Sequence, residues 1–197
     1  MDINYDKICS MIEIYLGLKI SKEALIKLLP YGRRIEFQKG EIILGIGQEM
    51  KKVYFILEGL TRSYYLDLEG RNVTKSFMGE YNFCLSESFL TKEKSIQCFE
   101  ALEYTTALEF NADELKQLLL ADDDLRNVYI KFLEATIVYK MNRESGFQLK
   151  SATERYIDFK KEFPKLEECV NQSYISSYLG ITAVSLSRIR RNIREEN

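Results

Sequence analysis

The sequence of 197 residues contains no histidine and no tryptophan, and it has only two prolines. Histidine is the commonest general base and the commonest ligand of metals and haem. Its absence makes Ser-His and Cys-His nucleophiles impossible and disfavours most metal sites. Phosphate-binding patterns are also missing, because Gly45-Ile46-Gly47 is followed by Met50 rather than by a third glycine, and no Walker lysine pattern occurs. We therefore expect a protein that is not an enzyme, with no catalytic residues, no metal and no cofactor.

Cysteine is sparse, and the four residues, at positions 9, 84, 98 and 169, form no Cys-x-x-Cys pair. This spacing disfavours zinc and iron–sulfur sites and favours reduced thiols in the cytoplasm. The start of the chain carries Asp2, Asp6 and Glu13 within a broken apolar pattern, which resembles neither a signal peptide nor a membrane-spanning helix. We expect a cytoplasmic protein that does not associate with membranes.

Acidic residues are missing from one stretch near the end of the sequence. The formal net charge is −2, and residues 1–150 carry 20 basic against 23 acidic residues, yet four arginines and no acidic residue occur between Gln172 and Arg194. A local positive charge on a mildly acidic chain favours a polyanionic partner and orients this end of the protein towards it.

The same stretch has the pattern of two helices joined by a tight turn. Gly180 can adopt a left-handed conformation, and Thr182 is a suitable N-cap for the second helix. Apolar residues occur at helical spacing on both sides of this break, at Ile175, Leu179, Leu186, Ile189 and Ile193. The pattern predicts a helix-turn-helix. The alternative is an ordinary helical hairpin inside an all-α subdomain, with a solvated arginine face.

Between Arg33 and Phe110 the sequence changes to short β-prone runs separated by glycines. The runs are IEF, EIIL, VYFILEG, LTRSYYL, NVTKSFM, SIQCFEA and YTTALEF. Several short strands at this spacing predict a sandwich or jelly roll. A sheet domain that binds no ligand fits the same pattern.

A long helix is expected from Asp123 to Ser145, because its apolar residues follow two helical faces. One face consists of Leu125, Val128, Phe132, Ala135 and Tyr139, and the other of Ile130, Leu133, Ile137 and Met141. Two apolar faces require two partners, and we assign the first to a homodimer interface. The alternative is a helix wholly buried within a monomer.

Together these segments predict an α+β protein with three parts. Residues 1–122 form an effector-sensing jelly roll with flanking helices, in which Ser21 and Asn111 act as helix caps. Residues 123–145 form the dimerisation helix, and Gly146 marks a hinge. Residues 146–197 form an all-α helix-turn-helix domain.

This order of parts resembles the Crp/Fnr family of bacterial transcription regulators. The resemblance is carried by Phe37 with Lys39-Gly40-Glu41, by the run Tyr54–Gly59, by Gly70-Arg71, and by the closing stretches 174–182 and 186–190. It implies a cyclic-nucleotide-binding-like domain and a homodimer whose recognition helices enter successive major grooves of double-stranded DNA, about 34 Å apart. It also implies RNA polymerase as a partner.

On the family pattern, Gln172, Ser173 and Tyr174 lie near the phosphates. The residues expected along the base edges or beside them are Thr182, Ala183, Val184, Ser185, Ser187, Arg188, Arg190 and Arg191. Arg188 is the best candidate for guanine, whose O6 and N7 match the guanidinium fork. Ala183 and Val184 stand where other members carry more polar residues, which favours contact with thymine methyl groups or readout of DNA shape. A β-wing like that of many relatives is not expected after this helix.

The effector site is expected in the loop FCLSESFLTKEKSIQCFEA. In members that bind cyclic nucleotides, a glutamate holds the ribose, and an arginine followed by a hydroxyl residue holds the phosphate. Here Ser95 and Ile96 occupy the arginine and hydroxyl positions. The candidate effector-binding residues are Glu87, Ser88, Lys94 and Ser95, with Lys92 nearby, and we expect cyclic AMP to bind weakly or not at all.

Two other functions fit parts of the sequence. One is a regulator that does respond to cyclic AMP. The other is a ligand-binding or scaffold module whose helical tail binds protein rather than DNA, and salt dependence of duplex binding would separate it from a DNA-binding regulator.

Overall fold

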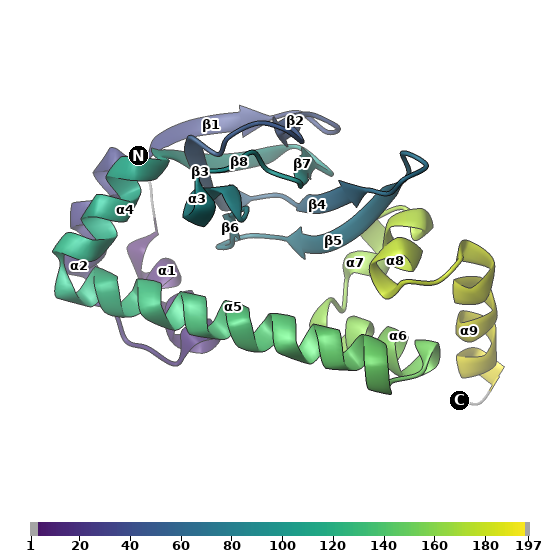
Figure 1. Cartoon of the computed structure of the whole chain (residues 1–197). Helices are drawn as coiled ribbons and strands as arrows, with labels where there is room; N and C mark the ends of the chain where they lie inside the picture. The colour runs from purple at the N-terminus through teal and green to yellow at the C-terminus, as the bar shows by residue number, and fades with distance from the viewer. Residues whose placement is uncertain (1–3, 196–197) are drawn as a thin grey trace.

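The computed structural model describes residues 4–195 and shows a β-roll above one long helix, with a small helical domain beside the far end of that helix (Figure 1). The chain begins with helices α1 (Tyr5–Leu16) and α2 (Lys22–Leu28), followed by a 3-10 turn (Leu29–Tyr31). The Ser21 hydroxyl accepts a hydrogen bond from the Ala24 amide, as expected of an N-cap. The predicted cap is therefore confirmed.

Eight strands follow in the predicted region. They are β1 (Arg33–Phe37), β2 (Ile42–Leu44), β3 (Lys52–Glu58), β4 (Thr61–Leu66), β5 (Asn72–Met78), β6 (Phe83–Cys84), β7 (Cys98–Ala101) and β8 (Thr105–Asn111). They form two antiparallel sheets in the orders β1-β8-β3-β6 and β2-β7-β4-β5. This architecture confirms the predicted jelly roll and the α+β class. Strand β6 was not predicted, because two residues are too few to show an alternating pattern.

The core of the roll comes from the central strands of the first sheet. Val53 and Ile56 of β3 and Leu108 of β8 are fully buried, because these strands have neighbours on both sides. Gly59, which joins β3 to β4, has φ 104°, and a Cβ there would lie 2.7 Å from the Tyr104 carbonyl oxygen. Only glycine fits this turn without displacing backbone.

Helix α5 is longer than the sequence predicts. It spans Asp123–Leu149. Two shorter helices precede it, α3 (Ser88–Thr91) and α4 (Ala112–Ala121). Asn111 caps the N-terminus of α4, as expected. Gly146 is a buried residue within α5, so it does not form the predicted hinge. The chain turns instead at Lys150 and Ser151, where the helical hydrogen bonding ends.

The C-terminal domain contains α6 (Ala152–Glu162), α7 (Leu166–Cys169), α8 (Gln172–Leu179) and α9 (Ala183–Glu195). Ser151 and Glu154 form a capping box at the start of α6. A separate apolar core lies between these helices and includes Phe159, Ile175 and Leu186. Phe77 of β5 also belongs to this core, so the roll and the C-terminal domain are packed together.

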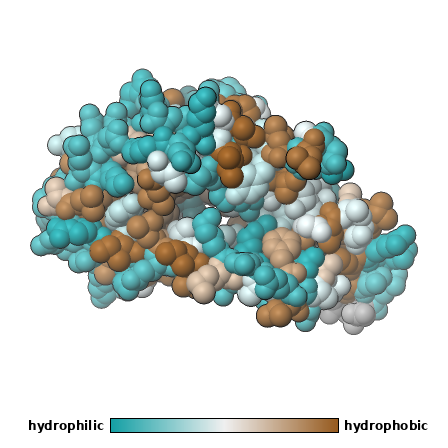
Figure 2. Space-filling model, in the orientation of Figure 1, coloured by the Kyte–Doolittle hydropathy of each residue, from teal (hydrophilic) through white to brown (hydrophobic). Residues whose placement is uncertain are grey.

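Between residues 4 and 195, no helix combines the length and apolar character needed to cross a membrane. Apolar side chains nevertheless reach the surface along the lower edge of the molecule, where α5 runs (Figure 2). The exposed apolar residues of α5 include Ile130, Ile137, Val138 and Met141.

Candidate nucleic-acid interface and effector region

The turn between α8 and α9 has the geometry that the sequence predicts. Gly180 is left-handed, with φ 67° and ψ 35°, and ends α8. The Ile181 amide donates to the Ser176 carbonyl at 3.0 Å, and the Thr182 hydroxyl caps α9 by accepting from the Ser185 amide at 3.1 Å. A Cβ on Gly180 would also lie 2.8 Å from the Phe147 ring of α5. The angle between the two helices is thus fixed by backbone and packing.

Helix α9 packs through Leu186, which is fully buried, and through the half-buried Ile189. The opposite side is exposed and contains five of the eleven predicted DNA contacts, namely Ala183, Val184, Ser187, Arg188 and Arg191. These positions recur at intervals of three and four, so they share one helical face. Gln172, Ser173 and Thr182 are also exposed.

Three predicted DNA contacts are turned inward. The Arg190 side chain is only 11% exposed and forms an ion pair with Glu167, in which Nε and Nη2 lie 2.8 and 2.7 Å from Oε1. Tyr174 is half-buried beneath the Arg62 guanidinium of the roll, at 3.5 Å from its ring centroid. Ser185 is half-buried, and its hydroxyl lies 2.9 Å from that of Thr182. These three side chains therefore do not belong to the exposed face of α9 that contains Ser187, Arg188 and Arg191, which we call its free face.

Helix α8 is attached directly to the roll. The Thr74 amide of β5 donates to the Ser177 hydroxyl at 3.0 Å, and the Phe77 ring lies 5.5 Å from that of Tyr178. Arg62, which stacks on Tyr174, is buried and forms an ion pair with Glu100 at 2.8 Å. No local sequence pattern indicates the contact between Arg62 and Tyr174, because it depends on how two separate domains pack.

Helix α5 also holds α8. The Tyr139 and Tyr178 hydroxyls lie 3.0 Å apart, and Arg143 Nη2 donates to the Tyr178 carbonyl at 2.7 Å. Burial raises the pKa of both phenols, so they remain protonated hydrogen-bonding groups at neutral pH.

This arrangement corrects the predicted dimer interface. Leu125 is 2% exposed within the core of the roll, and Val128 packs against the same core. Phe132 makes an edge-to-face contact with Phe83, with ring centroids 5.8 Å apart, and Tyr139 contacts α8. Ala135 is half-buried and lines a groove shared with α1. The face assigned to a partner is thus covered by its own chain, because periodicity defines two faces without saying which one meets the roll.

The second apolar face of α5 is the one left open. Ile130, Ile137 and Met141 are 44%, 57% and 62% exposed, and Leu133 is half-buried between them. Positions 130, 133, 137 and 141 follow the spacing of a helix–helix seam.

The predicted effector loop uses most of its polar groups internally. Glu87, at the start of α3, accepts from the Ile96 amide at 2.8 Å and from the Ser95 hydroxyl at 3.3 Å, and the Gln97 side-chain amide also donates to it. Partial burial opposes ionisation, but these hydrogen bonds and the charge of Lys75 outweigh it and lower the pKa of Glu87. Its main visible role is to join α3 to the start of β7.

The other three predicted effector-binding residues, Ser88, Lys94 and Ser95, are not arranged around an open site. The Ser88 hydroxyl is buried, accepts from the Met50 amide at 2.9 Å and donates to the Glu93 carbonyl. The Ser95 hydroxyl is buried and donates to the Gln97 carbonyl at 3.0 Å. Lys94 is exposed, and Lys92 pairs with Asp113. Hence Ser88, Lys94 and Ser95 do not converge with Glu87 on an open site.

The segment that comprises the roll, α3 and α4 is similar to a known protein family. Residues 34–122 match the family model of the cyclic nucleotide-binding domain. No sequence match was found among curated proteins.

The whole chain is similar to several solved structures. FixK2 from Bradyrhizobium japonicum has a TM-score of 0.71 at 20% identity, covering 84% of this chain and 85% of that chain. The c-di-GMP responsive global regulator CLP from Xanthomonas campestris has a TM-score of 0.71 at 12% identity, covering 89% and 93%. A CooA mutant from Carboxydothermus hydrogenoformans has a TM-score of 0.71 at 16% identity, covering 100% and 86%. At these identities the similarity establishes the fold alone.

Within residues 34–122, sequence reasoning missed a cation on β5. Burial, together with the nearby charge of Lys140 on α5, lowers the pKa of Lys75 to about 8. The Lys75 ammonium lies 5.6 Å from the centre of the Tyr65 ring. In sequence, Lys75 is one polar residue in a β-prone run, and no local pattern indicates that the charge of a lysine 65 positions later acts on it.

Proposed function

We propose that the protein is a transcription regulator of the Crp/Fnr type that binds operator DNA as a homodimer. The observation that carries the proposal is the α8–Gly180–α9 unit, in which Thr182 caps a helix whose free face presents Ser187, Arg188 and Arg191. A positively charged helix with a polar, solvent-exposed face is suited to the major groove, since guanidinium groups can pair with both base edges and phosphates.

The dimer follows from the open face of α5. Ile130, Leu133, Ile137 and Met141 form an apolar stripe on a helix of 27 residues. Pairing of this stripe with its copy about a two-fold axis buries it and places two α9 helices on one side of the assembly. We assign the interface to this face instead of the one that contains Leu125.

We also propose that a small effector in the roll regulates the protein and that the protein contacts RNA polymerase. The cytoplasm is the proposed compartment, in keeping with four free cysteine thiols at positions 9, 84, 98 and 169. Cyclic AMP is not the proposed effector, because no arginine occupies the position of the phosphate clamp and Ser95 is buried there.

The test is fluorescence anisotropy with a random duplex library, followed by the selected duplex, over a range of salt concentrations. We expect affinity to fall steeply as salt rises, and a selected palindromic site to bind at least about 10³-fold more tightly than random duplex. A folded dimer that binds no duplex would contradict the proposal and favour a module whose helical tail binds protein.

A further inference from the structure

A hollow in the C-terminal domain lies between α6, α7 and the last turns of α9. Its volume is about 240 Å³, below the roughly 300 to 1,000 Å³ of sites for drug-sized ligands, so it suits a small molecule. Tyr156 and Lys160 are four residues apart on α6, and Arg190 and Arg194 are four apart on α9, so each pair lies on one helical face. The residues that line the hollow, which we call the α6–α9 pocket, are Tyr156, Lys160, Glu167, Arg190, Ile193 and Arg194.

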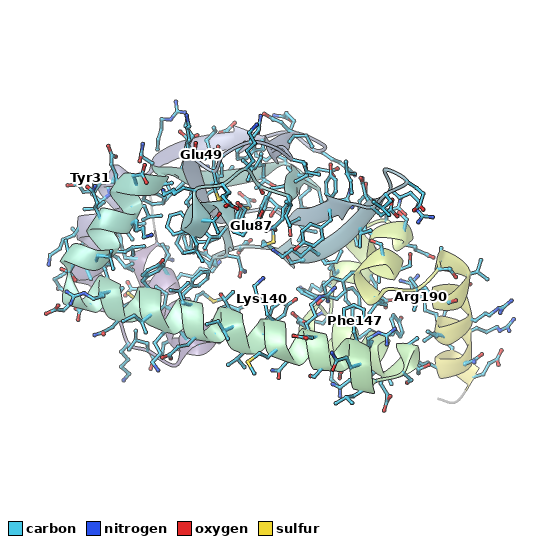
Figure 3. All side chains as sticks on the ribbon, in the orientation of Figure 1. Tyr31, Glu49, Glu87, Lys140, Phe147 and Arg190 are labelled. Carbon is cyan, nitrogen blue, oxygen red and sulfur yellow. The ribbon has the colours of Figure 1, made fainter. Side chains whose placement is uncertain are left out.

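Arg190 contributes to this pocket a nitrogen that lacks an acceptor. Its side chain extends from α9 towards the rest of the C-terminal domain (Figure 3), where Nε donates to Glu167 Oε1 at 2.8 Å. Nη2 lies 2.7 Å from the same oxygen, but it is enclosed by protein and has no hydrogen-bond partner in the part of the chain that the structure describes. The Tyr156 hydroxyl also donates to Oε1, at 2.5 Å, so this oxygen already accepts two hydrogen bonds. A buried donor without an acceptor is costly, and a ligand oxygen in the pocket would remove that cost.

The pocket also has an excess of positive charge. Three of its lining residues are cations and one is a carboxylate, so their formal charge is +2. Over residues 4–195, Lys160 and Arg194 take part in no ion pair, and two acidic residues on the same helices, Asp158 and Glu195, pair with cations outside the pocket. Two guanidinium groups and an ammonium around one hollow favour an oxyanion, because each can donate charge-assisted hydrogen bonds to it.

The rest of the lining favours a ligand with an apolar body. The Tyr156 ring lies beside two of the cations, since Lys160 Nζ and the Arg190 guanidinium carbon are each 5.9 Å from its centre. The half-buried Ile193 adds apolar surface from α9. A small ring or alkyl chain can therefore pack beside Tyr156 while its charged group meets the cations.

We propose that the α6–α9 pocket binds a small phosphate monoester. A monoester carries a charge of about −1.5 to −2 at neutral pH, which matches the charge of the lining, and it has one free oxygen for each of the three cations. A backbone phosphate of DNA is a diester with a single charge, and so it matches this pocket less well. The bound monoester would link α6 to the last turns of α9, whether or not α9 contacts DNA.

Isothermal titration calorimetry with phenyl phosphate tests the pocket in the whole chain, at constant ionic strength. Lys160→Met and Arg194→Met should each weaken binding by about tenfold or more, because each removes a charged contact with the phosphate. Lys161→Met and Arg191→Met are the matched controls, since both residues are exposed on the same helices and do not line the pocket. They should bind within about twofold of the wild type, because solvent and salt screen their charges. Equal affinities in the wild type and all four variants, or no binding by the wild type, overturn the proposal.

Benzenesulfonate separates the effect of charge from that of shape, since it has a phenyl ring and three oxygens but a single charge. We expect it to bind the wild type at least about tenfold more weakly than phenyl phosphate. Inorganic phosphate should also bind more weakly than phenyl phosphate, because it lacks the ring that packs beside Tyr156. Equal affinity for either compound overturns the assignment to a monoester, and this comparison needs no variant that could misfold.

Melting temperatures show whether the two pocket variants are folded. Lys160 and Arg194 are exposed, so both variants should melt within about 2 °C of the wild type. Loss of binding in folded variants then supports direct contact with the ligand.

Duplex binding by Lys160→Met distinguishes a small-ligand pocket from a DNA contact. We expect this variant to bind random duplex within about twofold of the wild type. A tenfold loss of duplex affinity would assign the pocket to the DNA backbone and overturn the proposal. A folded wild type that binds phenyl phosphate but no duplex supports the pocket and overturns the proposed function instead.

Discussion

The backbone amide of Thr74 on β5 donates a 3.0 Å hydrogen bond to the side-chain hydroxyl of Ser177 on α8. This hydrogen bond joins the roll directly to the first helix of the α8–α9 pair. Since β5 also carries Phe77, whose ring lies 5.5 Å from that of Tyr178, the strand contacts α8 at two points. Movement of β5 relative to α5 would therefore change the position of α8.

Ser177→Ala tests how firmly this hydrogen bond holds the two domains. The substitution leaves the Thr74 amide without its acceptor, and we expect the free energy of unfolding to fall by about 1 kcal/mol. Urea denaturation, monitored by circular dichroism, measures this change in the free energy of unfolding. Ser187→Ala is the control, because Ser187 is exposed on α9 and should change stability little. Equal stability of Ser177→Ala and the control would mean that water replaces the contact at no cost.

Arg62→Ala should be among the most destabilising single substitutions of a charged residue. Its side chain is 1% exposed, ion-pairs with Glu100 and stacks on Tyr174, so its loss leaves a poorly solvated carboxylate between two domains. We expect a loss of about 3 to 5 kcal/mol in the free energy of unfolding. Arg71→Ala is the matched comparison, since Arg71 pairs with Asp67 at an exposed hairpin tip and should have little effect. A small loss for Arg62→Ala would indicate that the domains separate readily.

The sequence was informative wherever one local rule decided the outcome. Seven alternating runs became strands, Gly180 took the left-handed turn, and Thr182, Ser21 and Asn111 capped helices, because these features depend on a few neighbouring residues. Helical periodicity places Arg190 about 200° from Arg188 around α9. The structure agrees, because Arg188 is exposed and Arg190 is paired with Glu167.

The sequence was insufficient wherever the outcome depended on packing between distant segments. The two apolar faces of α5 have similar composition, and only contact with Phe83 and with the core of the roll decides that Phe132 and Leu125 lie inside. The charge of Lys75 near Glu87 could not be identified for the same reason, because these two residues come together only in the folded chain. Glycine is uncommon within helices, which favours a hinge at Gly146, yet this residue is buried inside α5.

Ile137→Glu should dissociate the proposed dimer without unfolding the subunit. Ile137 is 57% exposed in the isolated chain, so a carboxylate there is tolerated in the monomer but would be buried and unpaired in the seam. Analytical ultracentrifugation at micromolar concentration should show a dimer for the wild type and a monomer for the variant. Ile26→Glu, on the exposed side of α2, is the control and should remain dimeric. A dimer that survives Ile137→Glu would exclude this face of α5 as the interface.

Arg188→Ala and Arg190→Ala should give opposite results in two assays. Arg188 is exposed on the free face of α9, so its loss should leave the free energy of unfolding unchanged within about 0.5 kcal/mol. The same substitution should weaken binding to the preferred duplex by about 1 to 3 kcal/mol and relax the preference at one base pair. Arg190 instead holds Glu167, so its loss should lower the free energy of unfolding by about 1 to 3 kcal/mol.

For the fraction of Arg190→Ala that remains folded, we expect base preference to be retained, because the side chain lies behind the free face of α9. Arg191→Ala provides the third comparison: as an exposed residue whose role we assign to phosphate contact, it should weaken all duplexes alike and reduce the salt slope by about one per subunit. Anisotropy titrations of the selected and a random duplex, with urea denaturation of each variant, measure all of these quantities. If Arg190→Ala loses base preference while Arg188→Ala keeps it, then α9 must turn about its axis on binding, and the face that is exposed in the free protein is not the one that contacts DNA.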